Sequence, residues 1–123
     1  MKPEEGIERY TVLLLGAVDR PIPSFLHLQR ELFVISERDH GDITKETYQN
    51  QCRDLDVKPT KRLYERDQKG NFHITPMGKK VYNELVKVYR NDLKFRELIN
   101  RTKLVRKLYD SMSEEELLYL FST

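Results

Sequence analysis

Histidine and cysteine are the residue types that most often bind metals or activate nucleophiles, and this chain of 123 residues has three histidines and one cysteine. His27, His40 and His73 are far apart, and Cys52 has no cysteine partner, so no pair has the spacing of a metal site. His40 lies between two aspartates and is expected to be an ordinary turn residue. Cys52 lies on the apolar face of a predicted helix, where a free thiol usually behaves as a small core residue.

Other sequence signatures of catalysis are missing. The five glycines are scattered rather than grouped in a phosphate-binding loop. No serine has the context of a nucleophile elbow. Carboxylate pairs occur on charged helix faces, where solvation accounts for them. We therefore predict that the chain is not an enzyme, that it holds no metal or cofactor, and that its function is binding.

The balance of charge is nearly even, but its distribution is not. Charged residues make up 34% of the chain and hydrophobic residues 38%, which predicts one folded domain with a modest core. The net charge of +2 is too small to establish a nucleic-acid partner. However, residues 58–72 contain five Lys or Arg and two acids, and residues 79–107 contain ten Lys or Arg and three acids. Residues 110–116 contain four acids and no base.

Cysteine content and hydropathy predict the compartment. A single cysteine cannot form an internal disulfide, which favours a reducing compartment. The first residues are acidic and polar, so no signal peptide is expected. The longest apolar run, residues 12–18, is far too short to cross a membrane. We therefore expect a cytoplasmic protein without a membrane partner.

Residues 63–74 are predicted to form a short β-hairpin. Tyr64, Phe72 and Ile74 favour a half-buried pleated surface, and Gly70 permits a positive φ at the turn. The hairpin leads directly into a helix over residues 76–89, because Thr75 can cap it and Pro76 suits the first helical position.

The junction Phe72-His73-Ile74-Thr75-Pro76-Met77-Gly78-Lys79 resembles the end of the wing in winged helix-turn-helix proteins. In that family the second wing strand often runs into a Thr-Pro-x-Gly helix start. The resemblance covers about residues 7–90, and its N-terminal part matches by pattern only. It implies a mainly α fold with a small β-hairpin, namely a winged helix-turn-helix with additional C-terminal helices.

Three helices are predicted before the hairpin. The first covers residues 7–18, and its apolar face is broad enough to require burial on more than one side. Pro21-Ile22-Pro23 then breaks the helix and is expected to be extended, as a one-residue bridge to the hairpin. Ser24 caps a second helix that ends near residue 36, with a core stripe of Phe25, Leu28, Leu32 and Ile35. A third, polar helix begins at residue 42 or 44 and ends near residue 55.

In a winged helix the third helix enters the major groove and basic residues of the wing contact the DNA backbone or minor groove. The resemblance therefore implies that this chain is a DNA-binding protein and a transcription regulator. The Gln, Asn and Arg side chains on the outer face of the third helix are suitable for hydrogen bonds to base edges. The alternative interpretation is that this polar face is only exposed to solvent. The candidate DNA-binding residues are Lys45, Gln49, Asn50 and Arg53 in the third helix and Lys61, Arg62, Arg66 and Lys69 in the wing.

One feature opposes DNA binding. Residues 37–56, which contain the third helix, hold six acids and three bases, and acids repel phosphates. Many winged helices bind proteins instead, and fold does not determine function. The alternative hypothesis is therefore a winged-helix module that binds a protein partner and not DNA.

Residues 1–90 are interpreted as the winged-helix domain and residues 91–123 as a helical extension of the same compact domain. Asn91-Asp92 interrupts the helical pattern, and Ser113 begins a last helix with the capping box Ser113-x-x-Glu116. Apolar positions from Val81 to Met112 and an apolar tail at residues 117–121 need a partner surface. This order of elements resembles small uncharacterised archaeal winged-helix proteins and, more loosely, MarR- and PadR-type regulators, which often dimerise through added terminal helices. A homodimer is therefore expected.

Overall fold

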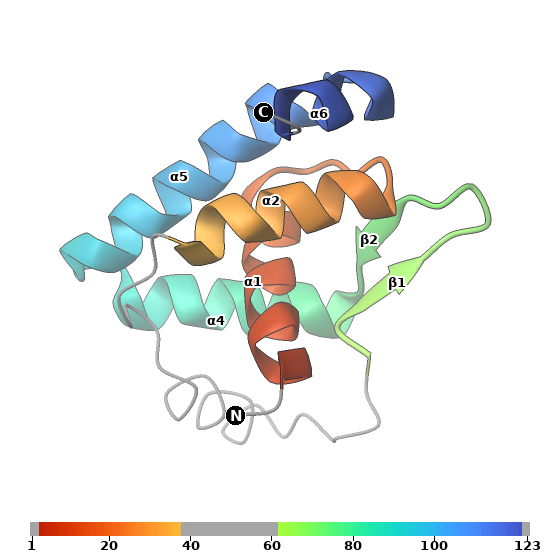
Figure 1. The fold of residues 1–123 in the computed structure, drawn as a ribbon. Coiled ribbons are helices and arrows are strands. Elements are labelled where there is room, and N and C mark those ends of the chain that lie inside the picture. Colours follow the sequence, from red (N-terminus) through yellow and green to blue (C-terminus); the bar gives the residue numbers. More distant parts are fainter. Residues whose placement is uncertain (1–2, 38–61, 122–123) are drawn as a thin grey trace.

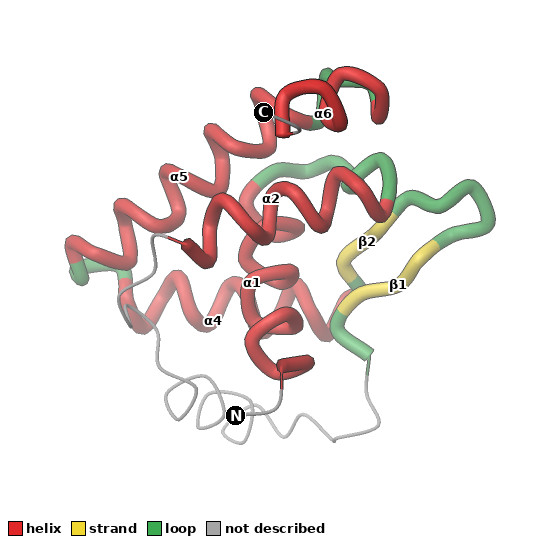
Figure 2. The backbone as a smooth tube through the Cα atoms, in the orientation of Figure 1, coloured by secondary structure: helices red, strands yellow, loops and turns green. Residues whose placement is uncertain are grey.

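The computed structural model describes residues 3–37 and 62–121, which form five helices and one two-stranded antiparallel sheet (Figures 1 and 2). This confirms the predicted mainly α fold with a small β-hairpin. The elements are α1 (Pro3–Ala17), α2 (Phe25–Glu37), β1 (Tyr64–Arg66), β2 (Phe72–Ile74), α4 (Pro76–Tyr89), α5 (Leu93–Tyr109) and α6 (Glu114–Phe121). The predicted third helix, with Cys52 and His40, lies outside the described residues.

Helix α1 forms the centre of the core. It contacts α2, α4, α5 and β2, while α5 and α6 pack on α2 (Figure 1). Every residue from Tyr10 to Leu15 is buried, and Val12, Leu13 and Leu14 are fully buried. The predicted burial of this helix on more than one side is confirmed. Six consecutive buried residues cannot all face one neighbour in a helix, so α1 must be surrounded.

The hairpin pairs Tyr64 with Ile74 and Arg66 with Phe72, and Gly70 has a φ of 92° in the turn. The segment that joins α1 to α2, residues 18–24, is called the linker here. Its Ile22 forms an isolated antiparallel bridge with Phe72, with N···O distances of 2.9 and 2.8 Å. The predicted one-residue bridge from the Pro-Ile-Pro segment to the hairpin is thus confirmed.

The helix boundaries follow the predicted caps. Thr75 caps α4 with Pro76 in its first turn, and Asp92 caps α5 after the predicted break. The Ser113 N–H donates to Glu116 Oε1 and the Glu116 N–H donates to Ser113 Oγ, both at 3.1 Å, which is the predicted capping box. None of the described helices has both the length and the apolar character needed to cross a membrane.

Two apolar residues at core spacing are half-exposed, namely Phe25 of the predicted stripe and Val88, which follows the buried Val81 and Leu85 at helical spacing. Phe25 is 53% exposed, although its ring lies 6.4 Å from that of Phe72, and Val88 is 48% exposed. The expected need for an outside partner from Val81 to Met112 is also only partly right. The break at Asn91-Asp92 redirects the chain, so that α5 buries Phe95 and Leu98 within the protomer against α1 and α2.

Candidate nucleic-acid interface

The turn of the hairpin is organised by one carboxylate. Oδ1 of Asp67 accepts the backbone N–H groups of Lys69 and Asn71, both at 2.9 Å, and Oδ2 accepts Asn71 Nδ2 and lies 2.8 Å from His73 Nε2. The hydrogen bond from His73, with smaller contributions from Asn71 and Lys69, holds the pKa of Asp67 well below its ordinary value. The Asp67 carboxylate therefore stabilises the turn through these hydrogen bonds.

Three of the predicted DNA-contacting cations lie in the described hairpin. Arg62, Arg66 and Lys69 are exposed, and none of them forms an ion pair with the part of the chain that the structure describes. The Arg66 guanidinium lies 5.4 Å from the centre of the Phe72 ring, which anchors its side chain at the end of the ladder next to the turn. The remaining candidate residues lie outside the described residues: Lys45, Gln49, Asn50, Arg53 and Lys61.

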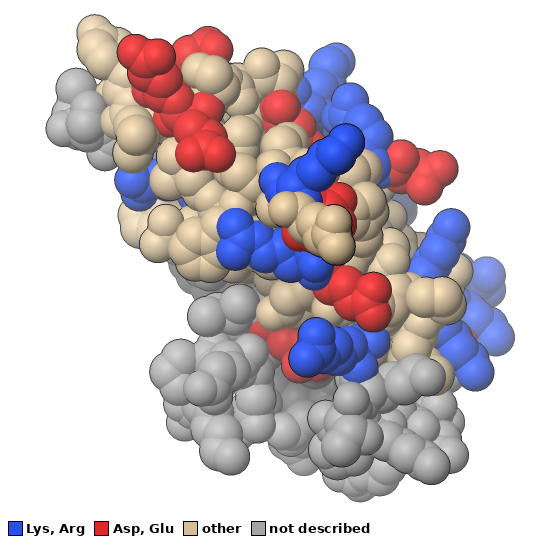
Figure 3. All heavy atoms as spheres, turned by 90° about the vertical axis from the view of Figure 1, so that its right-hand side faces the viewer, with Lys and Arg blue, Asp and Glu red and all other residues tan. Residues whose placement is uncertain are grey.

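The charge on this side of the molecule is mixed. Figure 3 faces the hairpin side of Figure 1, and over its coloured part Lys and Arg side chains are interleaved with Asp and Glu. In the hairpin itself, the exposed Glu65 pairs in register with His73. This side of the molecule thus offers separate cations for phosphate contacts rather than one continuous basic patch.

The Thr-Pro-x-Gly motif joins the hairpin to α4 by direct contacts. The Thr75 hydroxyl donates to the Arg62 carbonyl at 2.8 Å and accepts the Gly78 N–H at 3.0 Å, while the Thr75 N–H donates to the Leu63 carbonyl at 3.0 Å. A Cβ on Gly78 would overlap that same Leu63 carbonyl oxygen. The threonine therefore connects both segments, and the glycine permits their close approach.

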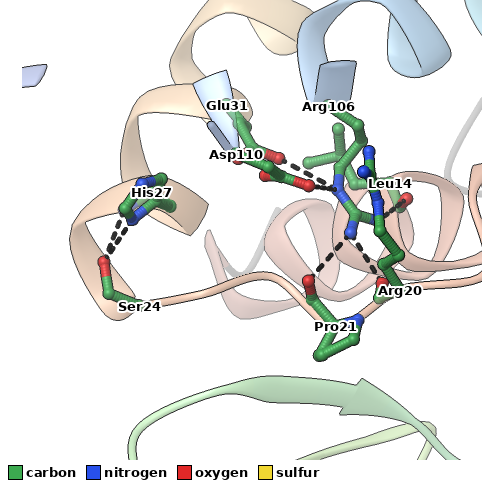
Figure 4. Close-up of polar contacts among 8 residues, drawn as sticks. All are labelled: Leu14, Arg20, Pro21, Ser24, His27, Glu31, Arg106 and Asp110. Carbon is green, nitrogen blue, oxygen red and sulfur yellow. Dashed lines mark hydrogen bonds and ion pairs between the residues drawn. The ribbon is translucent and has the colours of Figure 1, made fainter. Parts of the chain in front are cut away.

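The linker behind the hairpin is held by a fully buried arginine (Figure 4). Arg106 of α5 donates from Nη1 to the Leu14 carbonyl at 2.7 Å. Its Nη2 donates to the carbonyls of Arg20 and Pro21 at 2.6 and 3.0 Å. One guanidinium thus joins α5 to the end of α1 and to the linker that carries the Ile22 bridge. The sequence identified Arg106 only as one of the ten basic residues of 79–107, and its complete burial was not predicted.

Two carboxyl groups lie beside this guanidinium, and together the three residues are called the buried ionic cluster: Glu31, Arg106 and Asp110. Arg106 Nε is 2.7 Å from Asp110 Oδ2 but 3.6 Å from Glu31 Oε1, so Asp110 is the better-paired anion. Burial, followed by the hydrogen bond and charge of Asp110, raises the pKa of Glu31 to about 10. Glu31 therefore keeps a proton, which leaves the cluster neutral overall.

The protonated Glu31 predicts a specific pH dependence of stability. Its ordinary pKa is 4.5, so between about pH 4.5 and 10 the folded chain binds one more proton at this site than the unfolded chain. The contribution of Glu31 to stability is complete below pH 4.5 and falls with rising pH by up to about 1.4 kcal/mol per unit. Glu31→Gln cannot ionise and should remove that decline in urea unfolding measured from pH 6 to 9.

The matched control is Glu97→Gln, which removes an exposed carboxylate from α5 and should leave the pH dependence of the wild type unchanged. Parallel stability curves for the wild type and Glu31→Gln would show that Glu31 is ionised in the folded chain.

His27 is a second polar residue that sequence analysis did not place. It is buried, its Nδ1 accepts the Ser24 hydroxyl at 2.6 Å, and its Nε2 donates to the Met112 carbonyl at 2.7 Å. Ser24 Oγ also accepts the His27 backbone N–H at 3.1 Å, as a helix cap does. Ser24 and His27 are hydrogen-bonded to each other, as serine and histidine are in a catalytic pair. Here, however, their contacts join the start of α2 to the turn between α5 and α6.

A sequence signal for the buried ionic cluster did exist. Glu31 lies at helical spacing from the buried Leu28 and Ile35, and Arg106 follows the buried Val105. Opposite charges on the apolar stripes of two helices indicate a buried pair, because an isolated buried charge is too costly. The prediction of solvated helix faces concerned carboxylate pairs, and Glu31, which lies between Arg30 and Leu32, was not considered with them.

Within residues 3–37 and 62–121, no three His, Cys, Asp or Glu side chains are arranged to hold a metal ion. Comparison of the chain with protein-family models, with curated proteins and with solved structures returns no match. The case for a function therefore rests on the hairpin, its junction with α4 and the surface around them.

Proposed function

We propose that this chain is a winged-helix protein that binds duplex DNA and regulates transcription. The hairpin is the wing, and the observation that carries the proposal is its junction with α4. There Thr75 and Gly78 hold the wing base against the helix start, so that the exposed Arg62, Arg66 and Lys69 project from a fixed support. A fixed base lowers the ordering cost of each phosphate contact.

In this proposal the two groups of candidate residues have different roles. The wing cations contact phosphates and fix the register without reading sequence. Lys45, Gln49, Asn50 and Arg53 of the predicted third helix contact base edges in the major groove. The Ile22 bridge adds a third strand position to the wing at Phe72 and connects the wing to the linker held by Arg106.

Removing the three wing cations tests the proposal. The triple variant Arg62→Ala, Arg66→Ala and Lys69→Ala should weaken binding to all duplex sequences alike and reduce the slope of log K against log salt by up to about three units. Fluorescence anisotropy with a labelled mixed-sequence duplex, repeated from low to moderate salt, measures both quantities.

The control is a triple alanine variant of Lys87, Lys94 and Arg96, which has the same net charge but loses exposed cations of α4 and α5. It should bind like the wild type, since these helix segments lie away from the hairpin (Figure 1). Equal losses in both variants would show only nonspecific charge attraction, and a wild type that binds no duplex at low salt would contradict the proposal.

The second candidate function is a protein-interaction module, which is favoured by the mixed charge around the hairpin (Figure 3) and by exposed apolar residues at the C-terminus. Leu104 and Leu108 of α5 are 56% and 49% exposed and lie one helical turn apart. On α6, Leu118, Tyr119 and Leu120 are also exposed.

A second copy of the chain is the partner that we propose for this apolar surface. Lys103 and Lys107 flank the exposed leucines of α5, and Glu114, Glu115 and Glu116 precede those of α6. A two-fold pair can place the basic border of one protomer against the acidic border of the other, because isologous interfaces are self-complementary. Such a dimer would also present two wings to DNA.

Replacing the exposed leucines of α5 with charged residues tests the dimer. The wild type at micromolar concentration should have the mass of two chains by light scattering, and the double variant Leu104→Arg and Leu108→Arg should have the mass of one. Both leucines are half-exposed in the protomer, so the variant should keep its circular dichroism. Val88→Arg, at a half-exposed valine of α4, is the control and should remain dimeric. A monomeric wild type would rule out the dimer.

A further inference from the structure

A cavity of about 460 Å³ lies where the end of α1 and the linker meet β2 and the first half of α4. Its size is within the range of small-molecule sites in proteins. Part of its lining comes from the end of α1 and the linker, and the rest comes from β2 and α4. The residues that line it are Leu15, Gly16, Val18, Asp19, Arg20, Pro21, His73, Ile74, Lys79, Tyr82 and Asn83.

The charged groups of the cavity are not balanced. Arg20 of the linker and Lys79 of α4 are exposed cations, and neither side chain pairs with an acid in the part of the chain that the structure describes. Asp19 supplies one negative charge, while His73 is already hydrogen-bonded to Asp67. The cavity therefore has a net charge of about +1, which matches a monoanion better than a dianion.

The remaining lining favours an organic ligand over an inorganic ion. Leu15, Val18 and Ile74 give aliphatic surface, and the Tyr82 side chain, which lies against Gly16, adds a largely buried aromatic ring. An apolar body can displace water from these side chains, while an anionic group lies between the two cations.

We propose that this cavity binds a small monocarboxylate with an apolar body, and that Arg20 of the linker and Lys79 of α4 together bind its carboxylate. The ligand joins the linker to the start of α4, and both segments contact the hairpin through the Ile22 bridge and the Thr75 cap. Occupancy therefore restrains the hairpin relative to α1.

Benzoate is a suitable probe, with benzamide as its uncharged analogue. In ¹H–¹⁵N spectra of the full chain without DNA, benzoate should shift the amides of residues 16–20, 73–74 and 79–83 in a saturable manner. Benzamide should bind at least about tenfold more weakly, because a charge-assisted contact is lost. Arg20→Ala and Lys79→Ala should each weaken benzoate binding to a similar degree.

Lys80→Ala is the control, since it removes the exposed neighbouring cation that does not line the cavity, and it should bind benzoate like the wild type. The Arg106 contact uses the backbone carbonyl of Arg20, so Arg20→Ala leaves that contact in place. Equal binding of benzoate and benzamide, unchanged affinity in both alanine variants, or no saturable shifts at millimolar benzoate would each overturn the proposal. Because no DNA is present, the outcome is independent of the proposed regulatory function.

Discussion

Replacing Arg106 with methionine should lower the free energy of unfolding by about 3–5 kcal/mol, which is a large part of the stability of a domain of this size. The methionine fills much of the volume but carries no charge and no donor. Asp110 then loses its close cationic partner, and the carbonyls of Leu14, Arg20 and Pro21 lose the donors shown in Figure 4. Unpaired buried groups account for the cost.

The same substitution should have a local effect at the hairpin. Arg106 holds the linker carbonyls directly before Ile22, and Ile22 pairs with Phe72 through two backbone hydrogen bonds. Amide hydrogen exchange at Ile22 and Phe72 should therefore accelerate more than exchange at Leu85, which is buried in α4. Urea unfolding gives the global loss of stability, and exchange followed by NMR gives the local one.

Two further variants separate charge from hydrogen bonding. Arg106→Lys keeps the positive charge but cannot reach carbonyls on both sides with a planar fork, so it should retain only part of the stability. Arg96→Met removes an exposed arginine of the same helix and should change the free energy of unfolding by less than about 0.5 kcal/mol. Similar stabilities for Arg106→Met and Arg96→Met would contradict the anchoring role of Arg106.

The sequence predicts the parts of this fold that depend on local chemistry. Thr75 and Ser113 were predicted to begin helices through side chains that bond the first turn, and Gly70 was predicted to occupy a turn with a positive φ. Asn91-Asp92 was predicted only as a break, and the structure shows that Asp92 also caps α5. These signals are confined to a few neighbouring residues, so they can be read without knowing the tertiary structure. The extended Pro-Ile-Pro segment belongs to the same class.

The parts that the sequence did not predict depend on which helices meet. Hydrophobic spacing identifies the inward face of α2 and α5, but not which charged residues on those faces are buried together. Glu31 and Arg106 are separated by 75 positions and become neighbours only because α5 packs across α2. Hydrophobic spacing also does not show which apolar residues stay uncovered. Phe25 and Val88 lie at core spacing, but both remain half-exposed because no described element covers them fully.

The candidate functional surfaces also include one part that the sequence predicted and one that it did not. The cations of the hairpin were predicted because a turn and two short strands place them, and the structure describes Arg62, Arg66 and Lys69 as exposed. The cavity beside Arg20 and Lys79 was not predicted, because its walls come from segments that only tertiary packing brings together. Two cations 59 positions apart carry no local signal of a shared site.

Replacing Gly78 with alanine should destabilise the chain by about 2 kcal/mol or more, although alanine is ordinarily the better helix former by about 1 kcal/mol. The added Cβ would overlap the Leu63 carbonyl oxygen and would lie 2.9 Å from the Leu63 carbonyl carbon. Both of these obstacles are backbone atoms of the residue directly before β1, so relief requires α4 to move away from Leu63. That movement would lengthen the hydrogen bond from the Thr75 N–H to the Leu63 carbonyl, now 3.0 Å.

Gly78→Ala tests the junction because the expected change in stability is opposite to the one that helix propensity alone predicts. Lys80→Ala, at an exposed position near the start of the same helix, introduces the same residue without a backbone obstacle and should change the free energy of unfolding only slightly. Urea unfolding compares the two variants, and amide exchange at Thr75 reports whether the junction opens. A Gly78→Ala chain that is as stable as the wild type, with an unchanged Thr75 amide, would mean that close approach of Leu63 is not required. The glycine would then contribute nothing to the support of the hairpin, and the motif on which the winged-helix proposal depends would lose its physical basis.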